Sequence, residues 1–230
     1  MLFSLPQVQR QSDIEEDGKL LAISQALGMR DRYTEGHGQR VSLYAARLAR
    51  RLGLSEEDIE NIRIGGMLHD IGKIGFSNRI FSNEEAALTK EMNDEIHSHP
   101  WIGRMILSNM NFNESVLDYV WYHHERVDGK GYPCGLCNEE IPLGARIISV
   151  ADCFDAMTTD RPYQGRKSLP EAFATLNRIS GKVLFPGLVS AFVQEICENG
   201  VISETIASPA IARGSSPMPP SIQISPFTSS

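Results

Sequence analysis

The sequence of 230 residues predicts an all-α protein. Two observations carry this prediction: apolar residues recur at intervals of three and four positions along most of the chain, and glycine and proline are concentrated between these periodic segments. A third observation agrees, because no two alternating apolar and polar runs are joined by a tight turn, as a β-hairpin would require. The length suits one domain with flanking segments.

The expected helices follow one another from Lys19 onward. Apolar residues at helical spacing mark the first two: Leu20, Ile23 and Leu27, then Val41, Tyr44, Leu48 and Leu52. Gly53 is a stop signal for the second helix. Ser55, with Asp58 three positions later, approximates a capping box for a third helix that ends near His69 and Asp70. Further helices are predicted over residues 84–97, 100–110, 114–125, 145–157, 169–180 and 187–199.

Composition divides the chain into three parts. Residues 1–18 are mixed and polar, which predicts a solvated lead-in to a domain that covers residues 19–205. Residues 206–230 are rich in serine and proline and nearly free of charge. Such a segment buries too little apolar area to offset chain entropy, so we expect a disordered tail.

The overall composition favours a soluble cytoplasmic protein. No stretch approaches the roughly 18 to 20 apolar residues of a membrane span, and the first residues lack the pattern of a secretory signal. The 4 cysteines are too few for a disulfide scaffold, and the pair Cys134 and Cys137 lacks the second pair of a zinc site. A net charge of -7 argues against a nucleic-acid duplex as partner, although a local cationic site could bind a smaller anion.

The histidines are unevenly placed. Five of the 6 fall at or beside the ends of predicted helices: His37, His69, His99, His123 and His124. His97, on a polar helix, is expected to be exposed. His69 and Asp70 follow an apolar helix, and because neighbouring helical positions differ by about 100°, they could contact two metal ions with the carboxylate as a bridge. The alternative for this segment is an ordinary salt bridge between Asp70 and Lys73.

A second charged pair lies in residues 145–157, which are apolar almost all round and therefore predict a buried helix. Asp152 and Asp155 share one face of it, and at least one of them must meet a cation, either a metal ion or a residue such as Arg146. The adjacent His123 and His124 favour ligation by two different ions, whereas a single core histidine would usually be a packing residue.

Together these residues offer nitrogen and oxygen donors, with no thiolate at ligand spacing. Such a set suits Fe, Mn or Zn more than a structural zinc site. It can form a two-metal clamp for phosphoester hydrolysis, in which ions about 3.5 to 4 Å apart polarise the phosphoryl oxygens and activate water.

An ordered series of motifs carries a family resemblance. In chain order they are Tyr33-Thr34-Glu35-Gly36-His37, His69-Asp70-Ile71-Gly72-Lys73, His99-Pro100 with Gly103, His123-His124-Glu125-Arg126, Asp128-Gly129, Gly131-Tyr132-Pro133, Ser149-Val150-Ala151-Asp152, Asp155-Ala156-Met157 and Arg161-Pro162-Tyr163. With these motifs the chain resembles an HD-GYP domain, a subgroup of the HD phosphohydrolase superfamily, over roughly residues 19–200.

The resemblance implies an HD-domain-like helical bundle with a glycine-rich GYP loop. The implied activity is a metal-dependent phosphodiesterase that hydrolyses cyclic di-GMP to pGpG, GMP or both. The implied metal ligands are His37, His69, Asp70, His99, His123, His124 and Asp152. Asp70 would bridge the ions and act in catalysis together with Lys73. Tyr33 stands where some relatives have a glutamate for a third metal, so we expect two divalent ions, Fe or Mn.

The resemblance also implies how substrate is held. Lys73 would bind the scissile phosphate and stabilise the transition state, and Arg161 would pair with a substrate phosphate. Gly131 and Tyr132 would shape a loop against the substrate, and this loop is an expected contact for diguanylate cyclase (GGDEF) domains. Two alternatives stay open: a non-catalytic cyclic-dinucleotide sensor or docking module for GGDEF domains, and a hydrolase of another nucleotide such as a cyclic GMP-AMP dinucleotide.

Overall fold

The computed structural model describes residues 36–82, 89–160 and 165–202, with scattered positions between residues 18 and 28. Its helices are α2 (His37–Arg51), α3 (Glu56–Leu68), η1 (Ile71–Gly75), α4 (Asn78–Ser82), α5 (Lys90–His97), α6 (His99–Ser108), α7 (Glu114–Tyr122), η2 (Asn138–Glu140), α8 (Leu143–Thr158), α9 (Leu169–Ile179) and α10 (Pro186–Asn199). Within these ranges no strand forms beyond a single bridge between Ser180 and Leu184. The predicted all-α fold is confirmed.

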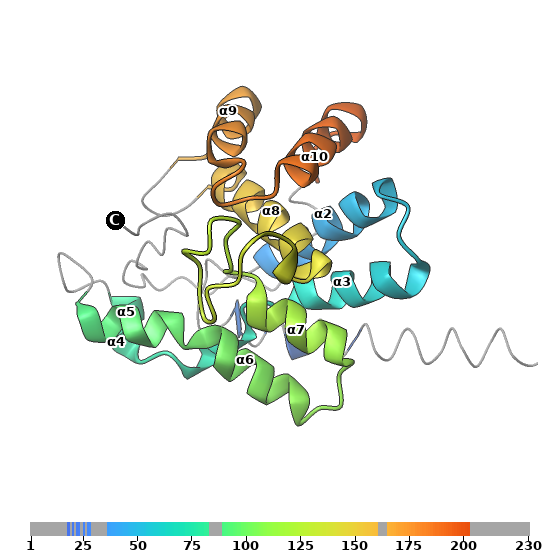
Figure 1. Ribbon diagram of the computed structural model, residues 1–230. Coiled ribbons are helices and arrows are strands. Elements are labelled where there is room, and N and C mark those ends of the chain that lie inside the picture. The colour runs from blue at the N-terminus through green and yellow to red at the C-terminus, as the bar shows by residue number, and fades with distance from the viewer. Residues whose placement is uncertain are drawn as a thin grey trace, which may run out of the picture.

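Helix α8 lies at the centre of the fold (Figure 1), and 11 of its 16 residues are buried. Helices α9 and α10 lie at one end of the molecule and α4 to α6 at the other, with α2, α3 and α8 between them. The largest apolar cluster joins α8 to α2, α3, α9 and α10, and a second cluster joins α3 to η1, α6 and α7. Any charged residue in the middle of α8 must therefore find a partner inside the protein.

Three helix boundaries follow signals in the sequence. Ser55 caps α3 by accepting a hydrogen bond from the Asp58 backbone N–H at 3.1 Å. Thr89 caps α5 in the same way, through the Met92 backbone N–H. Gly53 adopts a φ of 73° just after α2, a left-handed conformation that glycine tolerates without strain. Leu52 was wrongly expected to belong to the apolar face, because it lies past the last residue of α2 and is 37% exposed.

Several predicted boundaries need correction. The helix expected over residues 114–125 ends at Tyr122, because the Glu125 N–H bonds to the Tyr122 carbonyl in a turn. His123 and His124 therefore lie just beyond the helix rather than on it. Of the helix expected over residues 84–97, the described part begins at Lys90, and residues 83–88 lie outside the description. The short helices η1, α4 and η2 were missed because five residues or fewer show no periodicity.

The expected lead-in and tail fall largely outside the described residues, as does Arg161. Of the apolar residues predicted for the first helix, Leu20 and Leu27 are buried and Ile23 packs against the second cluster. No described helix combines the length and the apolar character that a membrane crossing requires.

Candidate metal centre

The helix ends that carry the predicted ligands meet against α8. His37 and His99 are the first residues of α2 and α6. His69 and Asp70 follow the end of α3, and the His123–His124 pair follows the end of α7. Asp152 comes from the buried middle of α8. The ligand residues therefore come from the ends of four helices and from the middle of a fifth.

All seven predicted ligand residues fall into two groups that could each hold a metal ion, with donor atoms within 4.8 Å of one another. The first, called here the His37 group, consists of His37, His69 and Asp152; the second, the His123 group, consists of Asp70, His99, His123 and His124. Asp70 faces both groups: its Oδ2 lies 3.4 Å from His69 Nε2, and its Oδ1 lies 3.5 Å from His99 Nε2. This is the placement that a bridging carboxylate needs.

Three imidazoles are oriented by the same backbone device. The Nδ1 atoms of His69, His99 and His123 lie 2.7 to 2.8 Å from the carbonyl oxygen of the residue three positions earlier. Because a carbonyl can only accept, each Nδ1 must carry the hydrogen, which leaves the Nε2 lone pair directed into the centre. A histidine at the end of a helix can make this bond because the last carbonyls of a helix lack partners within it.

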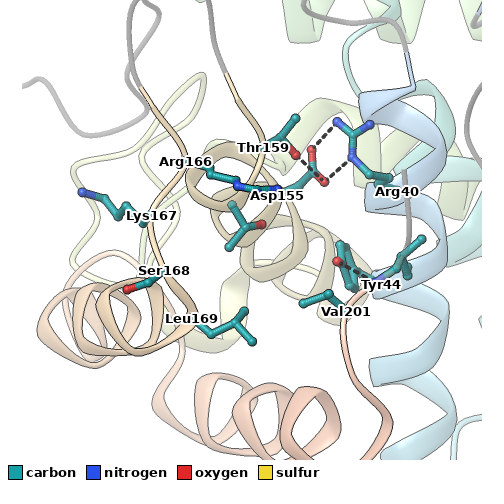
Figure 2. A pocket seen from close by; sticks show the side chains of 11 residues that line it. Arg40, Tyr44, Asp155, Thr159, Arg166, Lys167, Ser168, Leu169 and Val201 are labelled. Carbon is teal, nitrogen blue, oxygen red and sulfur yellow. Dashed lines mark hydrogen bonds and ion pairs between the residues drawn. The ribbon is translucent and has the colours of Figure 1, made fainter. Parts of the chain in front are cut away.

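His37 is oriented by a side chain instead. Its Nδ1 lies 2.7 Å from Oδ2 of Asp155, and its Nε2 lies 3.2 Å from Oδ1 of Asp152. Asp155 also accepts two hydrogen bonds from Arg40, at 2.6 and 3.0 Å. Figure 2 shows this ion pair at the wall of a cavity of about 580 Å³ that Ser168 and Leu169 also line. No member of the two ligand groups lines that cavity.

The roles of the two aspartates on α8 are therefore different. Asp152 belongs to the ligand cluster, whereas Asp155 holds His37 and pairs with Arg40. The prediction that at least one of them meets a cation is confirmed, but Arg146 is not the partner: its guanidinium lies over the Phe185 ring, 4.9 Å from the centroid. Asp155 was noted in the sequence, but no local signal linked it to His37.

Burial and charge set the protonation of the centre. Burial lowers the pKa of His99 to about 4, against the opposing charge of Asp70. Burial, reinforced by His69 and His99, lowers the pKa of His123 to about 3. Burial also works to lower the pKa of His37, but hydrogen bonds to Asp152 and Asp155 outweigh it and raise the value to about 9. His37 therefore holds a proton tightly while no metal is bound.

Lys73 lies beside the bridging position. Its Nζ is 2.6 Å from Oδ2 of Asp70, so the ion pair considered from the sequence exists together with the ligand cluster. Burial would raise the pKa of Asp70, but Lys73 and then the surrounding imidazoles hold it well below its usual range. The carboxylate is therefore ionised at neutral pH.

The glycine-rich loop is attached to this centre by Glu125. The buried carboxylate of Glu125 accepts hydrogen bonds from the backbone N–H groups of Cys134, Gly135 and Leu136. A Cβ on Gly131 would lie 2.5 Å from the Arg126 backbone nitrogen and 2.6 Å from the His124 carbonyl oxygen, so only glycine fits. Sequence reasoning did not assign this anchoring role to Glu125, because its partners are backbone groups that no side-chain pattern reveals.

The two loop cysteines have separate contacts. Cys134 Sγ accepts a hydrogen bond from Trp121 Nε1 at 3.4 Å, and Cys137 Sγ donates to Glu140 at 3.0 Å. Neither belongs to a group of possible metal ligands among the described residues.

Comparison with known proteins agrees with the predicted family resemblance. A family model described as HD domain matches residues 13–185. The sequence is 39% identical to a cyclic di-GMP phosphodiesterase of Thermotoga maritima, over 84% of this chain and 54% of that protein. It is 35% identical to a cyclic di-GMP phosphodiesterase response regulator of Xanthomonas campestris (87% and 55%) and 34% identical to 3'3'-cGAMP-specific phosphodiesterase 3 of Vibrio cholerae (76% and 38%).

Solved structures share the fold. An HDG"Y"P protein of Bdellovibrio bacteriovorus superposes with a TM-score of 0.58 at 21% identity, covering 70% of this chain and 51% of that one. The HD domain of the phosphodiesterase PgpH of L. monocytogenes, in complex with cyclic-di-AMP, gives 0.55 at 16% identity, covering 85% and 100%. The chain belongs to the HD domain family, and the predicted resemblance to HD-GYP proteins is confirmed. It spans about half the length of its first curated relatives.

Proposed function

We propose that the chain is a metal-dependent phosphodiesterase that hydrolyses cyclic di-GMP to linear pGpG, GMP or both. The observation that carries the proposal is the convergence of two donor groups on Asp70, with the Lys73 ammonium 2.6 Å from the same carboxylate. Curated relatives named as cyclic di-GMP phosphodiesterases support the choice of substrate. A cytoplasmic location follows from such an intracellular signalling substrate.

Two observations indicate that the donor set suits metal ions. The buried Nε2 atom of His69 has no hydrogen-bond partner. The Nε2 atoms of His99 and His123 lie 3.3 Å apart, and because both rings carry their hydrogen on Nδ1, no proton is shared between them. Facing lone pairs in a buried site are unfavourable unless a cation lies between them. Imidazole and carboxylate donors without thiolate suit Fe, Mn or Zn, and the resemblance to HD-GYP domains favours Fe or Mn.

We assign one ion to each group, with Asp70 as the bridge. When bound, such a pair polarises phosphoryl oxygens and lowers the pKa of a coordinated water. The chain's own residues orient the ligands. Asp155 and three backbone carbonyls fix the imidazoles, so that little rearrangement is needed on binding.

Lys73 is assigned to the scissile phosphate. Its ammonium is held at the edge of the centre by Asp70, and from there it can donate to a phosphate oxygen and stabilise the charge that develops during cleavage. Arg161 is assigned to a second substrate phosphate. Gly131 allows the loop to approach the centre closely, and Tyr132 follows it at the position assigned to substrate contact.

A second cyclic dinucleotide is a specific alternative substrate. A relative named 3'3'-cGAMP-specific phosphodiesterase is 34% identical over 76% of this chain, close to the identity of the cyclic di-GMP enzymes. A GGDEF domain that contacts the loop remains a prediction about partners.

The test is a turnover assay of purified protein loaded with Fe²⁺ without oxygen or with Mn²⁺. Cyclic di-GMP, 3'3'-cGAMP and cyclic di-AMP are compared, and product lengths are read by chromatography. We expect about two metal equivalents per chain, as the paired donor groups require, and cleavage of cyclic di-GMP. Less than one equivalent with no turnover of any substrate after reconstitution would reject the proposal. Binding without cleavage would favour the sensor.

A further inference from the structure

His97 makes a specific contact that its exposure does not predict. The side chain is exposed at the last position of α5, as the sequence suggested. Its ring nevertheless stacks on the Tyr132 ring, with centroids 4.1 Å apart and an interplanar angle of 26°. His97 precedes His99 by two residues, and the helix junction between them turns one imidazole into the centre and leaves the other outside it.

Tyr132 also stacks on His124, at 4.8 Å and 28°, and presents its ring to His99 at 6.4 Å and 80°. Tyr132 therefore stacks with one imidazole from α5 and with a second that belongs to the His123 group. Burial, then the charges of Asp70 and Asp152, raise the pKa of Tyr132 well above its ordinary value.

The two sides of this stack are anchored independently. On the loop side, the Tyr132 backbone N–H donates to the His124 carbonyl at 3.3 Å, and Tyr132 precedes the backbone N–H groups bound by Glu125. On the other side, α5 is fixed by Met92 and Ile96, which pack with Phe76 and Ile80. The carboxylate of Glu95 also accepts hydrogen bonds from the backbone and the hydroxyl of Ser77. His97 thus brings α5 against a loop whose other attachments are to the end of α7 and, through Asp128, to the Lys182 carbonyl between α9 and α10.

We propose that His97 is a positioning residue that holds Tyr132 over the metal centre by ring stacking and thereby strengthens binding of the cyclic dinucleotide. The inference rests on the proposed function for its kinetic consequence, but the stacking contact can be tested without substrate. His97 belongs to neither ligand group, so its removal should leave metal content unchanged.

The kinetic test compares His97→Ala with His97→Phe, which keeps an aromatic ring but no ring nitrogen. Asp94→Ala, exposed on the same helix, is the control. We expect His97→Ala to raise KM for cyclic di-GMP by roughly three- to tenfold, the order expected for one aromatic pair, with a smaller change in kcat. His97→Phe should restore most of the loss, and Asp94→Ala should behave as wild type.

A double mutant isolates the contact. In a Tyr132→Ala background, His97→Ala should have no further effect. The proposal is wrong if His97→Ala matches wild type, if His97→Phe is as impaired as His97→Ala, or if the effect persists without Tyr132.

Hydrogen exchange of the metal-loaded protein without substrate separates this inference from the proposed function. Backbone amides of residues 128–137 should exchange faster in His97→Ala than in wild type or His97→Phe. If the loop responds in this way but the wild type cleaves no cyclic dinucleotide, only the proposed function fails. If the loop does not respond, the positioning role fails whatever the activity.

Discussion

The two halves of the candidate metal centre use similar donor atoms but carry different charge. In the His123 group, backbone carbonyls orient His99 and His123, and burial keeps both rings neutral, with pKa values of about 4 and 3. In the His37 group, the carboxylate of Asp155 orients His37, and its pKa rises to about 9. A neutral partner thus leaves a lone pair ready for an ion, whereas a charged partner retains a proton that an ion must displace.

The largest effect is expected from the residue that joins the two halves. Asp70→Ala should abolish both metal binding and turnover, because it removes the carboxylate that faces both groups and that also forms an ion pair with Lys73. Elemental analysis and the turnover assay measure the two effects. A variant that keeps two equivalents of metal would show that Asp70 is not the bridge.

Lys73→Ala should separate metal binding from chemistry. We expect metal content to be retained and kcat to fall roughly 100- to 1,000-fold, the order seen when one preorganised donor to the transition state is lost. Lys73→Arg keeps the charge and should recover part of the rate. Lys90→Ala, exposed at the start of α5, is the control for removing a lysine elsewhere. Normal turnover by Lys73→Ala would contradict the assigned role.

Asp155→Asn should weaken metal binding only in the His37 group. Loss of the charge that orients His37 is expected to lower the affinity for one of the two ions by roughly 10- to 100-fold. The substitution also removes the charge that faces the buried Arg40, so the free energy of unfolding should fall by about 3 to 5 kcal/mol. Metal titration followed by calorimetry resolves the two equivalents.

The matched control for that prediction is Ser149→Ala. Ser149 lies on the same helix and donates a hydrogen bond to the carbonyl of His123, a member of the His123 group. It should leave both equivalents in place. If Asp155→Asn lost both ions or neither, the division of the centre into two halves would be wrong.

These expectations show how far the sequence alone could reach. Helical spacing predicted the long helices, since α2, α3 and α8 bury the side chains that the pattern marked, except Leu52 beyond the end of α2. Histidines next to helix ends indicated the ligand set, because a buried imidazole there can use the free carbonyls of the last turn. The seven predicted ligand residues do come together, although their role as ligands stays a prediction.

What the sequence could not show was pairing between distant residues. His37 and Asp155 are 118 positions apart, and nothing near either residue in the chain indicates the other. The same holds for His97 and Tyr132, which meet only because α5 and the loop reach the same edge of the centre. Exposure was predicted correctly for His97, yet exposure alone was a poor guide to what its ring contacts.

The smallest predicted effect concerns the pH dependence of stability in the metal-free protein. The folded pKa of His37, about 9, exceeds its ordinary value of 6.5, so its contribution is full below about pH 6.5 and is lost as pH rises through about 9. The depressed values of His99 and His123 act in the opposite sense: their neutral forms suit the fold above about pH 6.5, and stability falls as pH drops toward 4 and 3.

In the presence of a chelator, the stability measured by thermal unfolding should therefore be highest near pH 6.5. At alkaline pH the free energy of unfolding should fall by an amount on the order of 3 kcal/mol, which is the contribution of His37. Saturating Mn²⁺ should remove the alkaline decline, because His37 Nε2 would then no longer carry its proton. The loss of stability at acid pH should persist or become steeper, since protons and metal ions would compete for the same imidazoles. If the stability of the metal-free protein rose steadily from pH 6.5 to 9, His37 would be neutral. The two ligand groups would then not differ in charge in the way that the groups orienting their imidazoles imply.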